Sequence, residues 1–134
     1  MNIGEPLHPG LSAELATQVT EENSASAWGS GNLPVFATPA MIALMESASA
    51  AAVQDKLPPG CSTVGTELKV RHLSATPVGL EVRARGELLG QDRRRLSFKV
   101  EAWDPAGKIG EGTHERFIVE NEHFLKKTRE KMPK

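Results

Sequence analysis

The sequence predicts an α+β fold in which one long, mostly apolar helix packs against a single antiparallel sheet. The segment from Thr38 to about Lys56 is rich in residues that favour helix and holds one carboxylate in its centre. After Cys61 the hydrophobic pattern changes to a period of two, which persists to about Val119. Each strand in this region has one apolar and one charged face, so the sheet should cover a core on one side only. The helix is the element available to fill that side.

Length and composition favour one domain, residues 1–134, because compact domains commonly contain about 100–150 residues. The net charge of −1 gives no reason to expect nucleic acid or an anionic membrane as a partner. Cys61 is the lone cysteine, which excludes a disulfide framework and a four-ligand cysteine zinc site. The first residues lack the pattern of a signal peptide, and no run reaches the roughly 18 apolar residues of a membrane span. We therefore expect a cytoplasmic protein with no metal, no nucleic-acid partner and no membrane partner.

The segment before the helix predicts little regular structure. Residues 1–10 carry two glycines and two prolines and should form an irregular arm. A weak alternation over residues 11–19 predicts a short strand, and residues 28–34 predict a loop. Thr38 is the expected N-cap of the helix, because its hydroxyl can accept from backbone N–H groups. Pro39 would then be the first helical residue, where proline lacks only an N–H that has no helical partner.

Four strands are predicted after the helix, each alternating between two faces. The residues expected to share a face are Val64, Thr66, Leu68, Val70 and His72; Leu80, Val82, Ala84 and Leu88; Leu96, Phe98 and Val100; and Gly110, Gly112, His114 and Arg116. The sequence DPAGK predicts the hairpin turn between the last two strands. The tail, residues 121–134, predicts a short amphipathic surface helix.

Glu46 is the unusual residue of the helix, because it shares a surface with Ile42 and Ser49 and has no charged neighbour there. A partly desolvated carboxylate can serve as a base near neutral pH. Two other interpretations stay open, a glutamate at the one solvent-facing position and a glutamate paired with a buried arginine. His72 adds a second ionisable group from the sheet layer, and such pairs separate acid and base roles. The alternative for His72 is a hydrogen-bonded core histidine.

Thr38 and Glu46 would lie about 12 Å apart along a helix that rises about 1.5 Å per residue, too far for a hydrogen bond. If both serve one site, a substrate spans them, the helix begins late, or two subunits contribute. Arg116 can hold a phosphate, or it can form a surface salt bridge. The run Arg93–Arg95 is more typical of a solvated hairpin end than of a binding patch, although it could meet an anionic cofactor tail.

With these residues in place, the chain resembles the hot-dog-fold acyl-CoA thioesterases, most closely the fluoroacetyl-CoA thioesterase-like group. The resemblance runs from about residue 33 to residue 119 and rests on VFATPAMIALMESASAAAV, GTELKVRHLSATPVG and GEGTHERFIV. Four motif residues match by type and spacing: Thr38, Glu46 eight residues later, His72 twenty-six after that, and Gly65 seven before the histidine.

The resemblance implies a hot-dog fold, a long central helix wrapped by an antiparallel sheet, working as a homodimer with sites at the interface. It implies that Thr38, Glu46 and His72 are catalytic. It also implies that Gly65 offers its backbone N–H to the thioester carbonyl and that Arg116 lies near the coenzyme A side. The substrate would be an acyl-CoA, and no cofactor other than this coenzyme A would be needed.

One feature departs from the fluoroacetyl-selective members, which carry an aromatic lid ahead of the helix. The corresponding positions here are Gly29 and Asn32, although Trp28 and Phe36 lie close by in the sequence. A general short-chain or aryl acyl-CoA is therefore the expected substrate class.

The function that follows is an acyl-CoA thioesterase with Glu46 as general base or nucleophile. The alternative is a non-catalytic hot-dog domain that binds an acyl-CoA or a small acid. A hydratase acting on enoyl thioesters fits less well, because those enzymes usually pair an Asp and a His within one loop-helix segment, which this sequence lacks.

Overall fold

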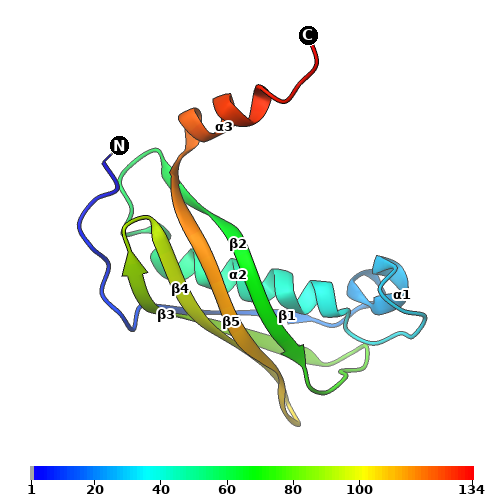
Figure 1. Ribbon diagram of the computed structural model, residues 1–134. Helices are drawn as coiled ribbons and strands as arrows, with labels where there is room; N and C mark the ends of the chain where they lie inside the picture. The colour runs from blue at the N-terminus through cyan, green and yellow to red at the C-terminus, as the bar shows by residue number, and fades with distance from the viewer. Residues whose placement is uncertain (1) are drawn as a thin grey trace.

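The computed structural model describes residues 2–134 and contains two layers, a five-stranded antiparallel sheet and a long helix in its concave face (Figure 1). The elements in chain order are β1 (Ser12–Gln18), a short 3₁₀ helix η1 (Glu21–Asn23), α1 (Ala25–Trp28), α2 (Thr38–Gln54), β2 (Cys61–His72), β3 (Glu81–Asp92), β4 (Arg95–Asp104), β5 (Gly107–Glu120) and α3 (Asn121–Arg129). The predicted α+β class, the long helix and the four strands after it are confirmed. The sequence did not predict η1 and α1, which occupy part of the segment before α2.

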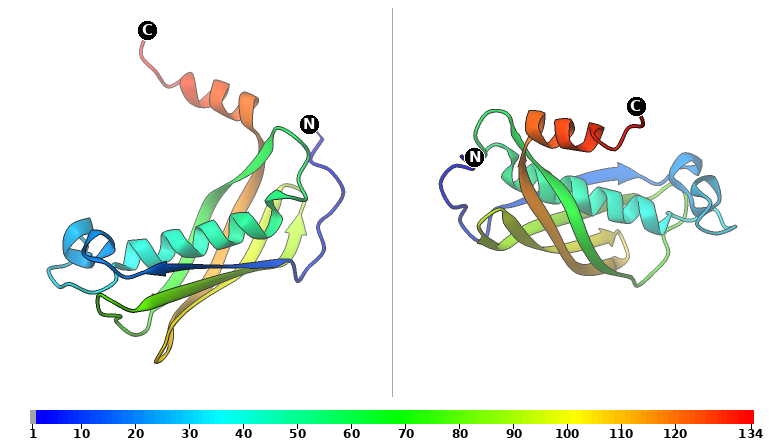
Figure 2. Two further views of the ribbon diagram at one scale, coloured as in Figure 1. Left: turned by 180° about the vertical axis from the view of Figure 1, so that it is seen from behind. Right: turned by 45° about the horizontal axis from the view of Figure 1, so that its top comes forward.

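The strands follow the order β1-β3-β4-β5-β2, so β1 and β2 form the two edges of the sheet. β2 directly follows α2 in the chain but pairs with β5, the last strand. The helix therefore connects one edge of the sheet to the other and crosses the concave face, which Figure 2 shows from behind and with the top of the molecule tilted forward. This crossing positions both ends of α2 close to sheet residues.

Contact between α2 and the sheet builds the core. Met41, Met45 and Val53 of the helix are fully buried against a set of inward side chains from the middle strands, including Val82 and Phe98. Burying a side chain of this size contributes about 1.5–3 kcal/mol relative to leaving it exposed. The core therefore fixes the position of the helix on the sheet.

Gly86 of β3 determines how closely the helix approaches. A Cβ at this position would lie 2.7 Å from both the Cα and the N of Ser49 on α2. The Ser49 hydroxyl donates to the Met45 carbonyl at 2.9 Å and so stays within the helix. The backbones of α2 and β3 are thus in direct contact, as expected where a glycine interrupts a strand.

The helix begins differently from the prediction. Ala37, not Thr38, is the N-cap residue, and Thr38 and Pro39 are the first two helical residues. Thr38 makes no capping hydrogen bond, so its predicted role as the N-cap is wrong. Proline fits equally well here, because the first four N–H groups of a helix have no helical acceptor. The Thr38 hydroxyl is left free to contact the sheet.

A β-bulge in β2 changes the predicted faces of that strand. Gly65 pairs with Arg116 and Glu67 with Glu115, so one residue is inserted between the two pairs. Paired residues share a face, and therefore Leu68, Val70 and His72 face the helix as predicted. The prediction that Val64 and Thr66 share this face is wrong, because the inserted residue reverses the alternation.

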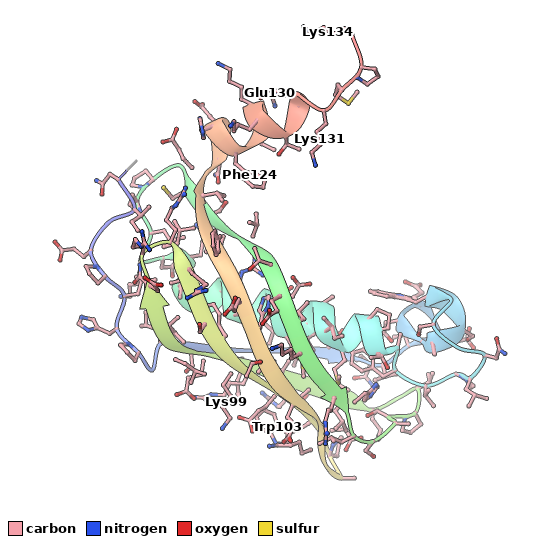
Figure 3. The ribbon with its side chains drawn as sticks, in the orientation of Figure 1. Lys99, Trp103, Phe124, Glu130, Lys131 and Lys134 are labelled. Carbon is pink, nitrogen blue, oxygen red and sulfur yellow. The ribbon has the colours of Figure 1, made fainter. Side chains whose placement is uncertain are left out.

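The outer parts of the molecule leave several apolar side chains exposed. Part of the α2 surface around Ala43 and Ser47 is not covered by the sheet. α3 projects from the end of β5 away from the two layers (Figure 1), and the labelled Phe124 and Lys131 lie out in this region in Figure 3. Within residues 2–134, no helix combines the length and the apolar character needed to cross a membrane.

Candidate active site

The first part of the site is a pair formed by Thr38 and His72. Thr38 Oγ1 and His72 Nδ1 are hydrogen-bonded at 2.7 Å, joining the first residue of α2 to the last residue of β2. The second ring nitrogen, Nε2, is buried and has no hydrogen-bond partner within residues 2–134. Burial lowers the pKa of His72 below its ordinary value, which a backbone hydrogen bond to Ser74 partly offsets. The ring is therefore poised to be neutral near pH 7, with one nitrogen oriented by Thr38.

A cleft of about 380 Å³ opens beside this pair. Its walls come from the segment between α1 and α2 and from the segment after β2, with Asn32, Leu33, Phe36 and Leu73 among the lining residues. Ligand pockets commonly measure about 300–1,000 Å³, so this cleft is at the small end of that range. It is large enough for a small acyl group and adjoins both Thr38 and His72.

The aromatic residues near the positions expected for a lid do not cover this cleft. Phe36 is almost fully buried in the core, and its ring forms part of the cleft wall. Trp28 ends α1 and donates its indole N–H to the Glu22 carbonyl at 2.9 Å. Gly29 follows it as the left-handed cap of α1, and Asn32 is one of several exposed residues in the cleft wall. The entrance is therefore lined by polar and aliphatic groups.

The second part of the site surrounds Glu46, two turns further along α2. Its Oε2 atom lies 3.6 Å from Nη1 of Arg116 on β5, and its side chain is 37% exposed. Of the alternatives left by the sequence, the structure shows a glutamate paired with a buried arginine. Such an arrangement leaves the carboxylate accessible to a ligand while one charged group fixes its orientation.

Arg116 is held on the inner face of the sheet. Its Nε donates to Thr63 Oγ1 at 2.7 Å and its Nη2 donates to the Thr63 carbonyl at 2.9 Å. The side chain is 8% exposed, so the alternative of a surface salt bridge is wrong. Burial lowers the pKa of Arg116, and the nearby Glu46 charge opposes this change. The predicted shared face of Gly110, Gly112, His114 and Arg116 is confirmed as the face toward the helix.

His114 completes this cluster and was not among the predicted site residues. Its Nε2 lies 3.1 Å from Nη1 of Arg116, and its Nδ1 lies 2.8 Å from the Glu67 carbonyl. The ring is 1% exposed, and burial together with the Arg116 charge lowers its pKa. Its position two residues before Arg116 on one face was visible in the sequence. Its contact with Arg116 was not.

Gly65 lies where β2 passes the Glu46 carboxylate. A Cβ on Gly65 would be 2.5 Å from Glu46 Oε2, 3.2 Å from His114 Cε1 and 3.3 Å from Arg116 Nη1. Only a residue without a side chain lets the carboxylate approach this strand so closely. Gly65 therefore contributes to the site by lacking a side chain, which leaves room for the Glu46 carboxylate.

The predicted site residues thus form two groups within one chain. Thr38 and His72 lie at the start of α2, and Glu46, Gly65 and Arg116 lie about two turns further along. The helix does not begin late, since α2 starts at Thr38, which removes one of the three explanations for their separation. Within residues 2–134, no three His, Cys, Asp or Glu side chains gather in a way that could hold a metal ion.

Comparisons with known proteins agree with this architecture. The family profile described as FlK, fluoroacetyl-CoA-specific thioesterase, matches residues 19–122. The chain is 46% identical over 99 residues to the fluoroacetyl-CoA thioesterase of Streptantibioticus cattleyicolor, and the match covers 74% of this chain and 71% of that enzyme.

Solved structures extend the agreement to nearly the whole chain. The fluoroacetyl-CoA thioesterase FlK superposes with a TM-score of 0.88 at 36% identity, covering 96% of this chain and 100% of the other. A hot-dog-like protein from Thermanaerovibrio acidaminovorans gives a TM-score of 0.85 at 21% identity, covering 94% of this chain and 93% of the other, which supports the fold alone. The sheet wrapped around α2 is thus a hot-dog fold, and the chain belongs to the fluoroacetyl-CoA-specific thioesterase family.

Proposed function

We propose that this protein hydrolyses the thioester of a short-chain or aryl acyl-CoA and releases the free acid and coenzyme A. The observation that carries the proposal is the accessible Glu46 carboxylate, oriented by a buried arginine beside a strand glycine, in a chain of the thioesterase family. The small cleft at Thr38 and His72 supports a small acyl group. No group other than the coenzyme A of the substrate is required.

Glu46 would act in one of two ways. As a general base, its carboxylate takes a proton from water while the water oxygen attacks the thioester carbonyl. As a nucleophile, the carboxylate attacks the carbonyl, the C–S bond breaks, and water then hydrolyses the resulting anhydride. In both routes the sulfur leaves as a thiolate that must gain a proton. His72, oriented by Thr38, would relay to the sulfur a proton that the attacking water releases.

The carbonyl oxygen gains negative charge during either attack. The backbone N–H of Gly65 would stabilise this oxyanion, and one such donor can contribute about 3 kcal/mol to the transition state. The contacts of Arg116 support a role in orienting Glu46, because its guanidinium is buried behind the carboxylate. This assignment uses each of the five predicted site residues, with Arg116 orienting Glu46 instead of lying near the coenzyme A side as the resemblance implied.

A homodimer would bring the two groups of residues together. β2 is an edge strand, and its inner face carries Leu68 at 37% exposure. An unpaired strand edge with exposed apolar side chains is suited to pairing with another strand. In such a dimer, the β2 strands of the two subunits would pair antiparallel with Lys69 at the centre. If the residue inserted at the bulge stays unpaired, Leu68 would lie opposite the partner's Val70, Glu67 opposite the partner's Arg71, and Gly65 opposite the partner's His72.

This pairing would complete the site across the interface. The Thr38–His72 pair of one subunit would face Glu46 and Gly65 of the other, so that neither subunit holds a whole site. The two copies of Lys69 would meet at the centre, each with Glu67 of its own chain 3.8 Å away to reduce their repulsion. The isologous symmetry would give two equivalent sites per dimer.

The first test measures thiol release from short, branched, fluorinated and aryl acyl-CoAs with the wild type and the Glu46→Gln variant. We expect release by the wild type and nearly complete loss in the variant, with the fold retained. Activity of the variant within a few-fold of the wild type would contradict the role of Glu46. Coenzyme A binding without release from any substrate would support the non-catalytic alternative instead.

The second test asks whether one site uses two chains. A Glu46→Gln chain and a His72→Ala chain are co-expressed with different tags, and the mixed dimers are purified. A site shared between chains leaves one of two sites intact, so we expect about half of the wild-type turnover. Mixed dimers as inactive as each variant alone would show that Glu46 and His72 act within one chain.

A further inference from the structure

We propose that His114 is a positioning residue, which fixes Arg116 and through it the Glu46 carboxylate. This inference rests on the proposed function, because it concerns the same carboxylate. It adds a buried histidine and the Thr63 side chain to the machinery of the site. Both residues are buried, His114 at 1% exposure and Thr63 at 9%.

The hydrogen bonds of His114 allow a single tautomer. Its Nδ1 lies 2.8 Å from a backbone carbonyl, that of Glu67, which can only accept, so Nδ1 carries the proton. Its Nε2 lies 3.1 Å from Nη1 of Arg116, which can only donate, so Nε2 is the acceptor. Both ring nitrogens are thus satisfied by the neutral form. A buried polar group in this state is costly to change.

Arg116 is constrained on three sides by these neighbours. The guanidinium has five N–H bonds, and its Nε and Nη2 each give one to Thr63 while Nη1 gives one to His114. Nη1 retains a second N–H, and the Nη1 atom lies 3.6 Å from Glu46 Oε2. The direction of that N–H is set by Thr63 and His114, because the contact with Glu46 itself is longer than a hydrogen bond.

Neighbouring groups enclose the His114 ring on all the elements packed against it. Phe98 of β4 packs near the ring, with centroids 6.1 Å apart. Across β2 it faces Leu68 and the Gly65 backbone. The charged groups that face it are Arg116 of its own strand and Glu46 of α2. Its exposure of 1% keeps it from contacting a substrate directly.

Protonation of His114 would remove the acceptor for Arg116. Nε2 would then carry a hydrogen directed at an N–H of the guanidinium, and Arg116 would have to move. Glu46 would lose the orientation that Arg116 gives it. The neutral ring is therefore the working state of this cluster, in keeping with the lowered pKa of His114 caused by burial and by the Arg116 charge.

Two matched pairs of variants test this proposal. His114→Gln keeps an acceptor near Nε2, whereas His114→Leu removes it. Thr63→Ser keeps the hydroxyl that receives Arg116 Nε, whereas Thr63→Val keeps the shape and removes the oxygen. Both pairs are assayed for kcat and KM in thiol release, beside the wild type and Glu46→Gln, and each is checked for folding by circular dichroism and thermal unfolding.

We expect His114→Leu and Thr63→Val to lower kcat roughly tenfold while KM stays within about twofold, because the orientation of a catalytic group is lost and substrate contacts are kept. The Gln and Ser variants should retain kcat within about threefold of the wild type. Equal kcat within each pair would overturn the proposal. Should His114→Leu fail to fold, His114→Ala, which also lacks an acceptor for Arg116, takes its place beside His114→Gln.

A readout independent of turnover separates this inference from the proposed function. In the wild type, the Arg116 Nε–H signal in nuclear magnetic resonance should exchange slowly with water, because its hydrogen bond to Thr63 is buried. We expect faster exchange in His114→Leu and not in His114→Gln. Slow exchange in both variants would overturn the positioning role. If the wild type hydrolyses no acyl-CoA, the thioesterase proposal fails, and the exchange experiment still determines whether His114 holds Arg116.

Discussion

Replacement of Gly65 by alanine is expected to reduce turnover without unfolding the protein. The added Cβ would lie 2.5 Å from Glu46 Oε2, whereas ordinary contacts begin at 3.4 Å. The carboxylate must therefore move by about 0.9 Å, the difference between those two distances. A misplacement of about 1 Å can cost about 100-fold in rate, which equals about 2.7 kcal/mol of transition-state stabilisation.

The fold should tolerate the same substitution. The atom in closest contact is the end of a flexible glutamate side chain, which can turn away at little cost. The other two neighbours, His114 Cε1 at 3.2 Å and Arg116 Nη1 at 3.3 Å, need to shift by a few tenths of an ångström. We therefore expect the free energy of unfolding to change by less than about 1 kcal/mol.

Stopped-time thiol release gives kcat, and urea unfolding followed by circular dichroism gives stability. Gly90→Ala is the matched control, because a Cβ at Gly90 meets no atom within 4 Å and this glycine also lies in a strand beside a bulge. The control should keep wild-type turnover. If Gly65→Ala stays folded and its kcat lies within about twofold of the wild type, then close approach of Glu46 to β2 does not matter for the reaction.

Three further outcomes are expected. Thr38→Val should lower kcat roughly fivefold, because it removes the 2.7 Å hydrogen bond to His72. Thr38→Ser keeps the hydroxyl and should keep the wild-type kcat. Equal kcat values for the two variants would contradict a role for this hydrogen bond. Gly86→Ala should destabilise the fold by about 1–3 kcal/mol in urea unfolding, because its Cβ would meet the Ser49 backbone at 2.7 Å, and an unchanged midpoint would refute this contact. Burial lowers the pKa of His72 and His114, so their neutral forms stabilise the native state fully above about pH 6.5, and this stability is lost as the pH falls through the lowered native values. Unfolding at a series of pH values between 8 and 5 should show this decline, and His114→Gln should reduce it; an identical decline in the variant would exclude His114 as a cause.

The local pattern of the sequence was sufficient to predict α2 and the four strands after it. The run of alanine, leucine and methionine after Pro39 predicted α2, and the period of two after Cys61 predicted β2 to β5. These signals depend on neighbouring residues along the chain, and a helix or a half-buried strand imposes its period on the sequence directly. The positions of Glu46 and His72 on their elements followed from the same signals.

The site also depended on features that no local pattern encodes. The bulge between Gly65 and Glu67 is a property of the pairing between β2 and β5, two strands far apart in the chain, and it brings Thr63 onto the inner face. That change of face lets Arg116 form two hydrogen bonds to Thr63 and so stabilises the arginine in a buried position. The sequence alone is equally consistent with Arg116 at the surface.

The sequence by itself thus determined α2, the four strands after it and most of their apolar faces, because each of these follows from short-range periodicity. Tertiary structure alone decided that Ala37 caps α2 and that Thr38 instead binds His72. It also decided that His114 and Arg116 stand behind Glu46. These contacts join residues distant in the chain, and their geometry is fixed by strand register and helix placement, which are set only when the whole sheet closes around the helix.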